Sequence, residues 1–407
     1  MRLTRRSMRN LAVPGAYLSE HALSTASNVA LTVVLANVAS VEEFGAVGAT
    51  YLAMAFVQQA SQAYFNDGAA STSKRIDPSE LSRRHVGAAA LLGLVLMPIV
   101  VVVGVATSTP FVVVAIFTLA LPVLVAQDQQ RHSSMRIDRF ASAVAAQVCW
   151  LLTFCLGVAI VAAQGEVTSG WAVLIWAGSG VVAFLYAIRL PELRPSALNV
   201  SIDELHRGWS VGFPLVLEHS AVFLAQFGLV IFMAIVTSDA DAAAFRGAQV
   251  LAVTSSIVAT AFRFLALRYA ATTVGSASFF GLRLAGLGAA ASFAVGIPVL
   301  FLPDSLGMKI LGDVWGPAFV LVPYILLQKA MTAATLGYIA VARSRLPLFQ
   351  IGGLRSAISV ASASIAAAIA WSNGPSSAIV TLAAGSVIMC LVLHGRLIRV
   401  ATEGAIA

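Results

Sequence analysis

Two apolar stretches of the sequence carry the same pair of titratable side chains. The pairs are Glu20-His21 and Glu218-His219, and their glutamates are 198 residues apart (218 minus 20). An amide follows each histidine by seven residues, close to two helical turns, so histidine and amide share one helix face. The amides are Asn28 and Gln226. Buried carboxylates exchange protons or bind cations, and histidine carries protons near neutral pH; a salt bridge between the halves and plain packing of the histidines are the open alternatives.

Three basic side chains also stand inside apolar stretches, namely Lys329, Arg246 and Arg263. An ionised group at the bilayer centre costs about 2.5–3.5 kcal/mol on insertion scales, so such groups usually face protein or a water-filled path. Lys329 lies near the middle of its stretch and suits an anionic substrate group; pairing with Glu20 or Glu218 and snorkelling are its alternatives. For Arg263 the favoured interpretation is snorkelling to lipid phosphate. Arg246 stands at the outer end of its stretch, where an interfacial position competes with a role in binding.

The composition identifies the solvent around these side chains. Of 407 residues, 59% are hydrophobic and 11% are charged, whereas soluble globular chains carry about 25% charged residues. A bilayer core of roughly 30 Å takes about 20 apolar residues per helix, and only helices or closed barrels can span it. The apolar runs are long and continuous, without the alternation of a barrel strand. The sequence therefore predicts an all-α integral membrane protein.

Twelve apolar stretches divide the chain. They cover 12–39, 46–65, 86–106, 110–126, 140–162, 169–188, 209–236, 246–267, 282–302, 318–341, 354–371 and 378–394. With the N-terminus in the cytoplasm, the cytoplasmic side collects 21 of the 25 Lys and Arg residues, as the positive-inside rule requires. The opposite side holds Lys309, and Arg246, Arg263 and Lys329 are assigned to neither side. Arg283 and Arg355, each at the cytoplasmic end of its stretch, are included in the 21. We therefore expect about 12 transmembrane helices with both termini in the cytoplasm.

A tandem repeat of two six-helix halves accounts for the matching pairs. Six spans is an even number, so both halves have the same orientation, as in transporters whose halves are related by an axis along the membrane normal. An acidic turn before Phe44 is matched by one before Phe245, with the register shifted by three residues. The predicted parts are an N-terminal bundle at 1–190, a cytoplasmic linker at 191–208 and a C-terminal bundle at 209–407.

Three segments at helix ends carry a resemblance to a known family. They are Val41-Glu42-Glu43-Phe44-Gly45, FNDGAASTSKRI at 65–76, and RHSSMRIDRF at 131–140. In them the chain resembles the polysaccharide exporter and O-antigen flippase family of the multidrug, oligosaccharidyl-lipid and polysaccharide (MOP) transporter superfamily. The resemblance implies two pseudo-symmetric six-helix bundles around a central cavity, as in the multidrug (MATE) transporters of that superfamily, which opens alternately to each side.

The same resemblance implies a substrate and a setting. The substrate is a polyprenyl-pyrophosphate-linked oligosaccharide, a precursor of cell-surface polysaccharide, which is moved from the cytoplasmic to the outer leaflet. The setting is the bacterial plasma membrane, where a monomer is surrounded by lipids and works beside enzymes of polysaccharide assembly. No cofactor is expected, while coupling to a proton or sodium gradient is compatible with the two glutamates.

Two other classes compete with this interpretation. A multidrug or organic-cation antiporter of the same superfamily would line its cavity with acids, whereas this chain offers Lys329 and two arginines beside two glutamates. A polytopic enzyme of polysaccharide assembly fits less well, because we find no metal-binding H-E-x-x-H, no P-loop and no nucleophile elbow. We therefore predict no catalytic residues and no metal site. Basic residues stand at the ends of apolar stretches and are not gathered on one module, which argues against nucleic-acid binding.

Overall fold

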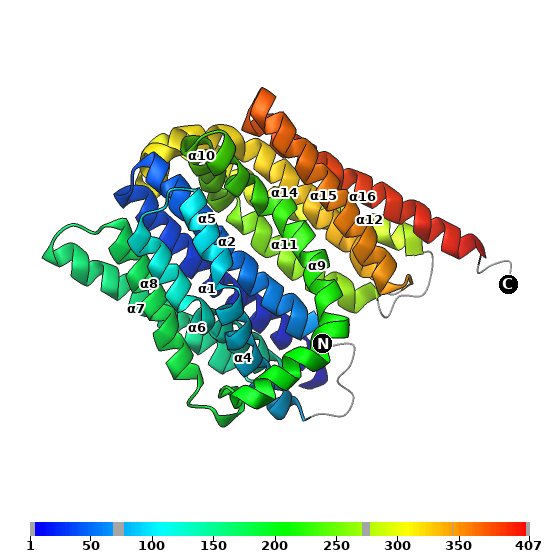
Figure 1. The fold of residues 1–407 in the computed structure, drawn as a ribbon. Coiled ribbons are helices and arrows are strands. Elements are labelled where there is room, and N and C mark those ends of the chain that lie inside the picture. Colours follow the sequence, from blue (N-terminus) through cyan, green and yellow to red (C-terminus); the bar gives the residue numbers. More distant parts are fainter. Residues whose placement is uncertain (1–4, 68–76, 271–276, 344, 404–407) are drawn as a thin grey trace. The chain divides into compact units, whose positions relative to one another are not determined.

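The computed structural model describes residues 5–67, 77–270, 277–343 and 345–403, and most of these residues lie in helices joined by short turns (Figure 1). Each of the 12 predicted stretches falls on a helix or on two consecutive helices. Within the described ranges, nine helices are long and apolar enough to cross a membrane, or up to 11 if each of two bent helix pairs counts as one span. The prediction of an all-α, multi-pass membrane protein is confirmed.

The chain divides into two compact units, Met1–Ser220 and Ala221–Ala407, called here the N-terminal and the C-terminal unit. The division falls inside one long helix, α9 (Leu198–Val236). The bounds predicted from the sequence for the two bundles and their linker stay a prediction.

The N-terminal unit is built from seven helices before α9, two of them forming one broken span. They are α1 (Arg5–Val38), α2 (Val41–Gln62), α4 (Pro78–Val95), α5 (Met97–Ala106), α6 (Phe111–Arg136), α7 (Phe140–Gln164) and α8 (Ser169–Ala187). A π-helical turn, η1 (Ala63–Asp67), follows α2, and a 3-10 turn, η2 (Pro191–Leu193), precedes α9.

The C-terminal unit continues from the second part of α9 through seven further helices. They are α10 (Asp239–Leu251), α11 (Val253–Ala270), α12 (Ala277–Gly296), α13 (Asp304–Leu311), α14 (Trp315–Arg343), α15 (Leu348–Asn373) and α16 (Pro375–Glu403). The short 3-10 turns η3 (Ile297–Phe301) and η4 (Gly312–Val314) lie on either side of α13.

The helices α2 and α10 begin with the same cap. The Ser40 hydroxyl accepts a hydrogen bond from the backbone N–H of Glu43 at 3.2 Å, and the Ser238 hydroxyl accepts one from Asp241 at 3.0 Å. Each cap satisfies a backbone donor that has no partner inside its helix, and the acidic side chain in the first turn complements the helix dipole. The same device therefore opens the second helix of each half, as a repeat requires.

Two predicted spans are interrupted next to a proline. The stretch 86–106 is divided at Leu96 into α4 and α5, and Pro98 stands in the first turn of α5. Likewise α12 ends at Gly296, and Pro298 stands at the start of the 3-10 turn that follows. Proline lacks the N–H that would continue the hydrogen-bond ladder, and it is tolerated in the first turn of a new helix.

An aromatic cluster holds the middle of the N-terminal unit together. The ring of Tyr51 lies edge-on to Phe117 and to Trp176, with centroids 6.2 Å and 5.8 Å apart. The indole N–H of Trp150 donates to the backbone carbonyl of Trp176 at 3.0 Å. Through these contacts α2, α6, α7 and α8 share one core, and the buried indole nitrogen of Trp150 is satisfied.

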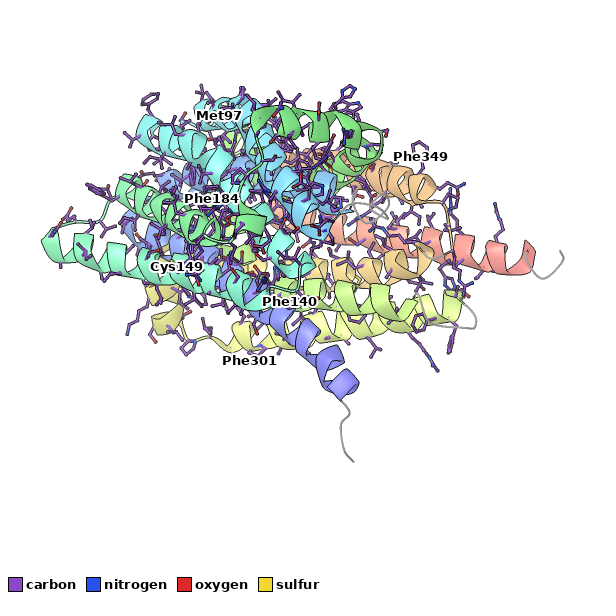
Figure 2. All side chains as sticks on the ribbon, turned by 90° about the horizontal axis from the view of Figure 1, so that it is seen from below. Met97, Phe140, Cys149, Phe184, Phe301 and Phe349 are labelled. Carbon is purple, nitrogen blue, oxygen red and sulfur yellow. The ribbon has the colours of Figure 1, made fainter. Side chains whose placement is uncertain are left out.

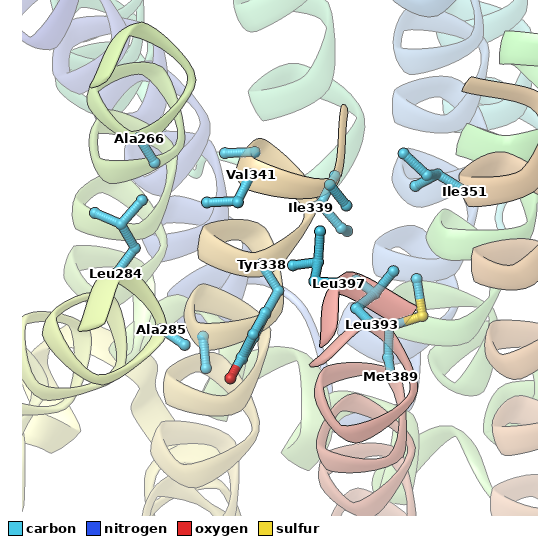
Figure 3. Packing of buried hydrophobic residues seen from close by; sticks show 13 residues of the cluster. Ala266, Leu284, Ala285, Tyr338, Ile339, Val341, Ile351, Met389, Leu393 and Leu397 are labelled. Carbon is cyan, nitrogen blue, oxygen red and sulfur yellow. The ribbon is translucent and has the colours of Figure 1, made fainter. Parts of the chain in front are cut away.

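The C-terminal unit has its own apolar core near one end of α14 (Figure 3). Tyr338 and Ile339 of α14 pack there with Leu284 of α12 and with Leu393 and Leu397 of α16. Large apolar side chains also point away from the helices: Phe301 and Phe349, labelled in Figure 2, are 79% and 83% exposed. In a membrane protein such exposed rings face lipid at no hydrophobic cost.

The predicted linker, residues 191–208, packs against the N-terminal unit. The side-chain amide of Gln130 in α6 donates to the carbonyl of Leu193 at 2.9 Å. Further along, the imidazole Nε2 of His85 in α4 lies 3.3 Å from a carboxylate oxygen of Glu204. The linker is thus fixed to the ends of α4 and α6 by polar contacts of buried side chains.

Candidate functional site

The second half of α6 carries a polar run, QDQQRHSS at 127–134, whose side chains are largely buried. The sequence predicted that the helix ends at 126 and that Arg131 belongs to a cytoplasmic loop. The predicted helix end was wrong, because α6 continues to Arg136 and includes Arg131, which is only 7% exposed. The cytoplasmic side of Arg131 stays a prediction. Hydropathy penalises such a run, whereas the folded unit accommodates it because its charges pair with one another.

Arg131 is the centre of an ionic network in the N-terminal unit. Its Nε lies 3.2 Å from a carboxylate oxygen of Glu20 on α1, and its Nη2 lies 2.9 Å from Oδ1 of Asp128. The amide of Gln62 at the end of α2 donates to Oδ2 of Asp128 at 2.7 Å. His132 adjoins both partners, 3.1 Å from Arg131 and 3.9 Å from Asp128. Three helices thus contribute to one buried cluster.

Among the described residues, the two carboxylates of Glu20 and Asp128 both lie against the guanidinium of Arg131. Buried charges are costly unless they are paired, and a second carboxylate beside the first favours uptake of a proton or a cation. The network therefore brings two acidic side chains against one buried guanidinium in the N-terminal unit.

The C-terminal unit holds the opposite charge. Lys329 of α14 is 8% exposed and Arg246 of α10 is 9% exposed, and the guanidinium acts on the ammonium group as a neighbouring like charge. The ammonium nitrogen lies 5.4 Å from the ring centroid of Phe227 on α9, a cation–π distance. Among the described residues, Lys329 has no carboxylate within 4.0 Å. Two cationic side chains are thus buried on the neighbouring helices α10 and α14.

The alternatives left open by the sequence are partly resolved. Glu20 pairs with Arg131, while the alternative bridge between Glu20 and Lys329, which lie in different units, stays a prediction. Arg246 is buried in α10, and its position at the membrane interface stays a prediction. Glu218 is buried in α9, while His21, His219 and Asn28 are half-buried. The side chains of Gln226 and Arg263 lie outside the described residues.

Asp128 and its network were missed by the sequence analysis, although the sequence contains a signal for them. Pro122 precedes Gln127 by five residues in α6, and Pro323 precedes Gln328 by five residues in α14. The two motifs are 201 residues apart (323 minus 122), the same offset that separates Phe44 from Phe245. In this register Asp128 of the first half corresponds to Lys329 of the second. The repeat thus places an acid and a base at equivalent positions.

No group of three or more His, Cys, Asp or Glu side chains suited to a metal ion occurs in the part of the chain that the structure describes. The predicted absence of metal and cofactor stays a prediction.

Two helical units of several spans each, with charges buried inside them, form the architecture of transporters built from repeated halves. No family model matches the sequence, and no curated protein matches it. Solved structures do match. An inward-facing multidrug resistance MATE family transporter of the MOP superfamily aligns with a TM-score of 0.67 at 13% identity, covering 93% of this chain and 95% of that one.

Two further structures agree with this likeness. The eukaryotic MATE transporter AtDTX14 aligns with a TM-score of 0.64 at 12% identity, over 97% of this chain and 95% of that one. The lipid II flippase MurJ, in an inward closed conformation, aligns with a TM-score of 0.54 at 9% identity, over 92% and 85%. The chain therefore shares its fold with these two MATE transporters and with this lipid II flippase.

Proposed function

We propose that this protein is a flippase that carries a polyprenyl-pyrophosphate-linked oligosaccharide from the cytoplasmic to the outer leaflet by alternating access. The observation that carries the proposal is the buried pair of cations in the C-terminal unit, Lys329 and Arg246. Both stand in apolar helices, where an unneeded charge would be costly. A pyrophosphate offers the charge-assisted hydrogen bonds that ammonium and guanidinium groups make best.

The ionic network of the N-terminal unit suggests how transport is driven. Glu20 and Asp128 share the single guanidinium of Arg131, so this unit gains electrostatic balance when it takes up a proton or a sodium ion. In this proposal the ion gradient drives the change between inward and outward states, with the anionic substrate held by the other unit. A ligand shifts such an equilibrium only through its different affinity for the two states.

The setting is part of the same proposal. The positive-inside distribution places both termini in the cytoplasm, and a lipid-linked oligosaccharide precursor places the protein in a bacterial plasma membrane. There it acts as a monomer among membrane lipids, supplied by enzymes of polysaccharide assembly.

A second function is favoured by the N-terminal network. If the two carboxylates of Glu20 and Asp128 bind the transported molecule itself, the protein is an antiporter for organic cations. The MATE transporters of similar fold make this the natural competitor. The two functions differ in which unit binds the substrate, and that difference can be measured.

The test uses purified protein in liposomes that contain a polyprenyl-pyrophosphate oligosaccharide and reads how fast the sugar becomes accessible to an external glycan-modifying enzyme. Wild type should expose the inner-leaflet pool. Replacement of Lys329 by Met should slow this by about tenfold or more, because a hydrogen bond to a charged group contributes about 1.5–3 kcal/mol. Lys309→Met, at an exposed lysine in α13, is the matched control and should leave the rate unchanged.

The opposite result is equally specific. If wild type leaves the lipid-linked sugar in the inner leaflet and instead accumulates a cationic dye against a proton or sodium gradient, the flippase proposal fails. In that case Glu20→Gln and Asp128→Asn should abolish dye transport while Lys329→Met retains it.

A further inference from the structure

The first part of α9, residues Leu198–Ser210, carries an exposed apolar stripe. Leu198, Ile202 and Trp209 are 64%, 50% and 59% exposed. Successive residues of a helix point in directions about 100° apart, so these three side chains lie within about 40° of one another. Two exposed charged residues, Asp203 and Arg207, point about 120–160° away from the middle of the stripe. The segment therefore presents separate apolar and polar faces to its surroundings.

A third face of the same segment is fixed to the N-terminal unit. Ser201 is 2% exposed, and a Cβ atom at Gly87 of α4 would lie only 2.3 Å from the Ser201 hydroxyl, so the two helices approach closely. The carboxylate of Glu204 lies 3.3 Å from the imidazole of His85, and the Tyr64 hydroxyl donates to a backbone carbonyl of the segment. These contacts prevent the segment from rotating, so the apolar stripe cannot turn inward against the unit.

The contacts also give the level of this segment along the spans. Gly87 stands at the start of the apolar stretch 86–106, and Tyr64 stands at the end of the stretch 46–65. Both contacts thus lie where polar residues give way to apolar ones, which is the level of the lipid headgroups for helices that cross a bilayer. Beyond Ser210 the chain bends by 74° before α9 continues (Figure 1). The segment therefore runs across the direction of the span that follows it.

We propose that Leu198–Ser210 is an interfacial amphipathic helix whose apolar stripe inserts into the lipid of the adjoining leaflet. Such helices bury their apolar face about 5–10 Å into the boundary between headgroups and acyl chains. Tryptophan is enriched at this level, because its ring is apolar and its N–H is polar.

The stripe continues beyond the bend. The ring of Phe213, which is 38% exposed, stacks on that of Trp209 with centroids 4.6 Å apart. The apolar surface of the segment is thus continuous with the start of the following span, which lipid surrounds in a membrane. Protein holds the segment on one face and lipid holds it on another, with Arg207 on the water side. This inference concerns the N-terminal unit and does not depend on the flippase function.

Spin labelling of the full-length protein in phospholipid liposomes tests the proposal. The native Cys149, Cys155 and Cys390 are replaced by alanine, and one new cysteine is introduced by Ile202→Cys or by Arg207→Cys. A spin label at position 202 should be relaxed by oxygen, which dissolves in acyl chains, and should lie about 5–10 Å inside the headgroup boundary. The label at position 207 is the matched control on the same helix, and it should be relaxed by a water-soluble nickel complex instead.

Two results of this experiment would overturn the proposal. Equal access of the nickel complex to both labels would place the stripe in water. A label at position 202 that neither reagent reaches would show that protein covers the stripe, for example a second copy of this chain.

A second measurement uses the wild-type protein and covers the case in which the cysteine variants do not fold. In liposomes that contain a phospholipid with a photoreactive diazirine near the headgroup end of one acyl chain, illumination should attach lipid to the peptide that contains Ile202 and Trp209. Mass spectrometry of the digested protein locates the adducts. Adducts on the exposed apolar side chains of α7 but none on this peptide would contradict the proposal.

Discussion

The two units carry equivalent helices with opposite charges at equivalent positions. In α6 the motif Pro122 to Gln127 is followed by Asp128, and in α14 the motif Pro323 to Gln328 is followed by Lys329. Around Asp128 the unit builds an ionic network, whereas around Lys329 the neighbouring charge is another cation. If the predicted repeat is a duplication, its two halves have kept the proline-to-glutamine motif while the buried charge that follows it has changed sign.

The largest effect should follow from removing the centre of the N-terminal network. Arg131→Leu leaves Glu20 and Asp128 as uncompensated buried carboxylates, so we expect a loss of about 3–5 kcal/mol in stability. Thermal unfolding in detergent measures this. The control is Arg139→Leu, because Arg139 is 57% exposed and 3.8 Å from Glu192, and an exposed pair is worth at most about 1 kcal/mol. Equal losses from the two variants would contradict the network.

A smaller loss should follow from neutralising the acid that corresponds to Lys329. Asp128→Asn keeps the size of the side chain and its oxygen for the Gln62 amide, while it removes the charge that faces Arg131. The expected cost is about 1.5–3 kcal/mol, the range for hydrogen bonds to charged groups. The same melting experiment compares it with Asp138→Asn near the end of α6. No loss on Asp128→Asn would mean that Glu20 alone balances the arginine.

We expect the N-terminal caps of α2 and α10 to contribute equally to stability, although the buried charges of the two units differ in sign. Ser40→Ala and Ser238→Ala each remove one side-chain acceptor at the start of α2 or α10. Each should cost about 1 kcal/mol, and the double variant should show the sum because the sites share no partners. If the losses of stability in the two single variants differ by more than about 1 kcal/mol, the two caps are not equivalent.

The smallest effect on stability is expected at Lys329. Lys329→Met replaces a buried cation with an apolar side chain of similar length, which removes a desolvation cost, so stability should change by less than about 1 kcal/mol or increase. Thermal unfolding measures the stability of this variant, and the liposome assay measures its transport rate. A large loss of stability would show that Lys329 is a structural residue of the C-terminal unit, like Arg131 in the other.

The sequence predicted most of the fold because membrane helices are dictated by local composition. A stretch of apolar residues long enough for the bilayer must form a helix there, and each of the 12 predicted stretches is helical. The break at Leu96 between α4 and α5 shows the limit of that reasoning, since the whole stretch is apolar and only the ladder of backbone bonds is interrupted.

The candidate site was predicted in part. The sequence correctly indicated that Glu20 and Lys329 are buried charged residues. An ionisable residue inside an apolar stretch can be recognised wherever in the stretch it lies. Arg131 and Asp128 were lost because they belong to a polar run that hydropathy assigns to a loop. The buried state of that run depends on partners from α1 and α2, distant in the sequence.

By itself, the sequence determined that this is a helical protein with many membrane-spanning helices, because length and hydropathy fix both, and its spacing predicted a tandem repeat. Tertiary structure alone decided which charges meet. In the folded N-terminal unit, Glu20 of α1 and Asp128 of α6 both contact Arg131. In the C-terminal unit, Lys329 lies near another cation, and Arg355 lines a small cavity. The reason is physical: helix formation depends on neighbours in the chain, whereas the energy of a buried charge depends on atoms a few ångströms away in space.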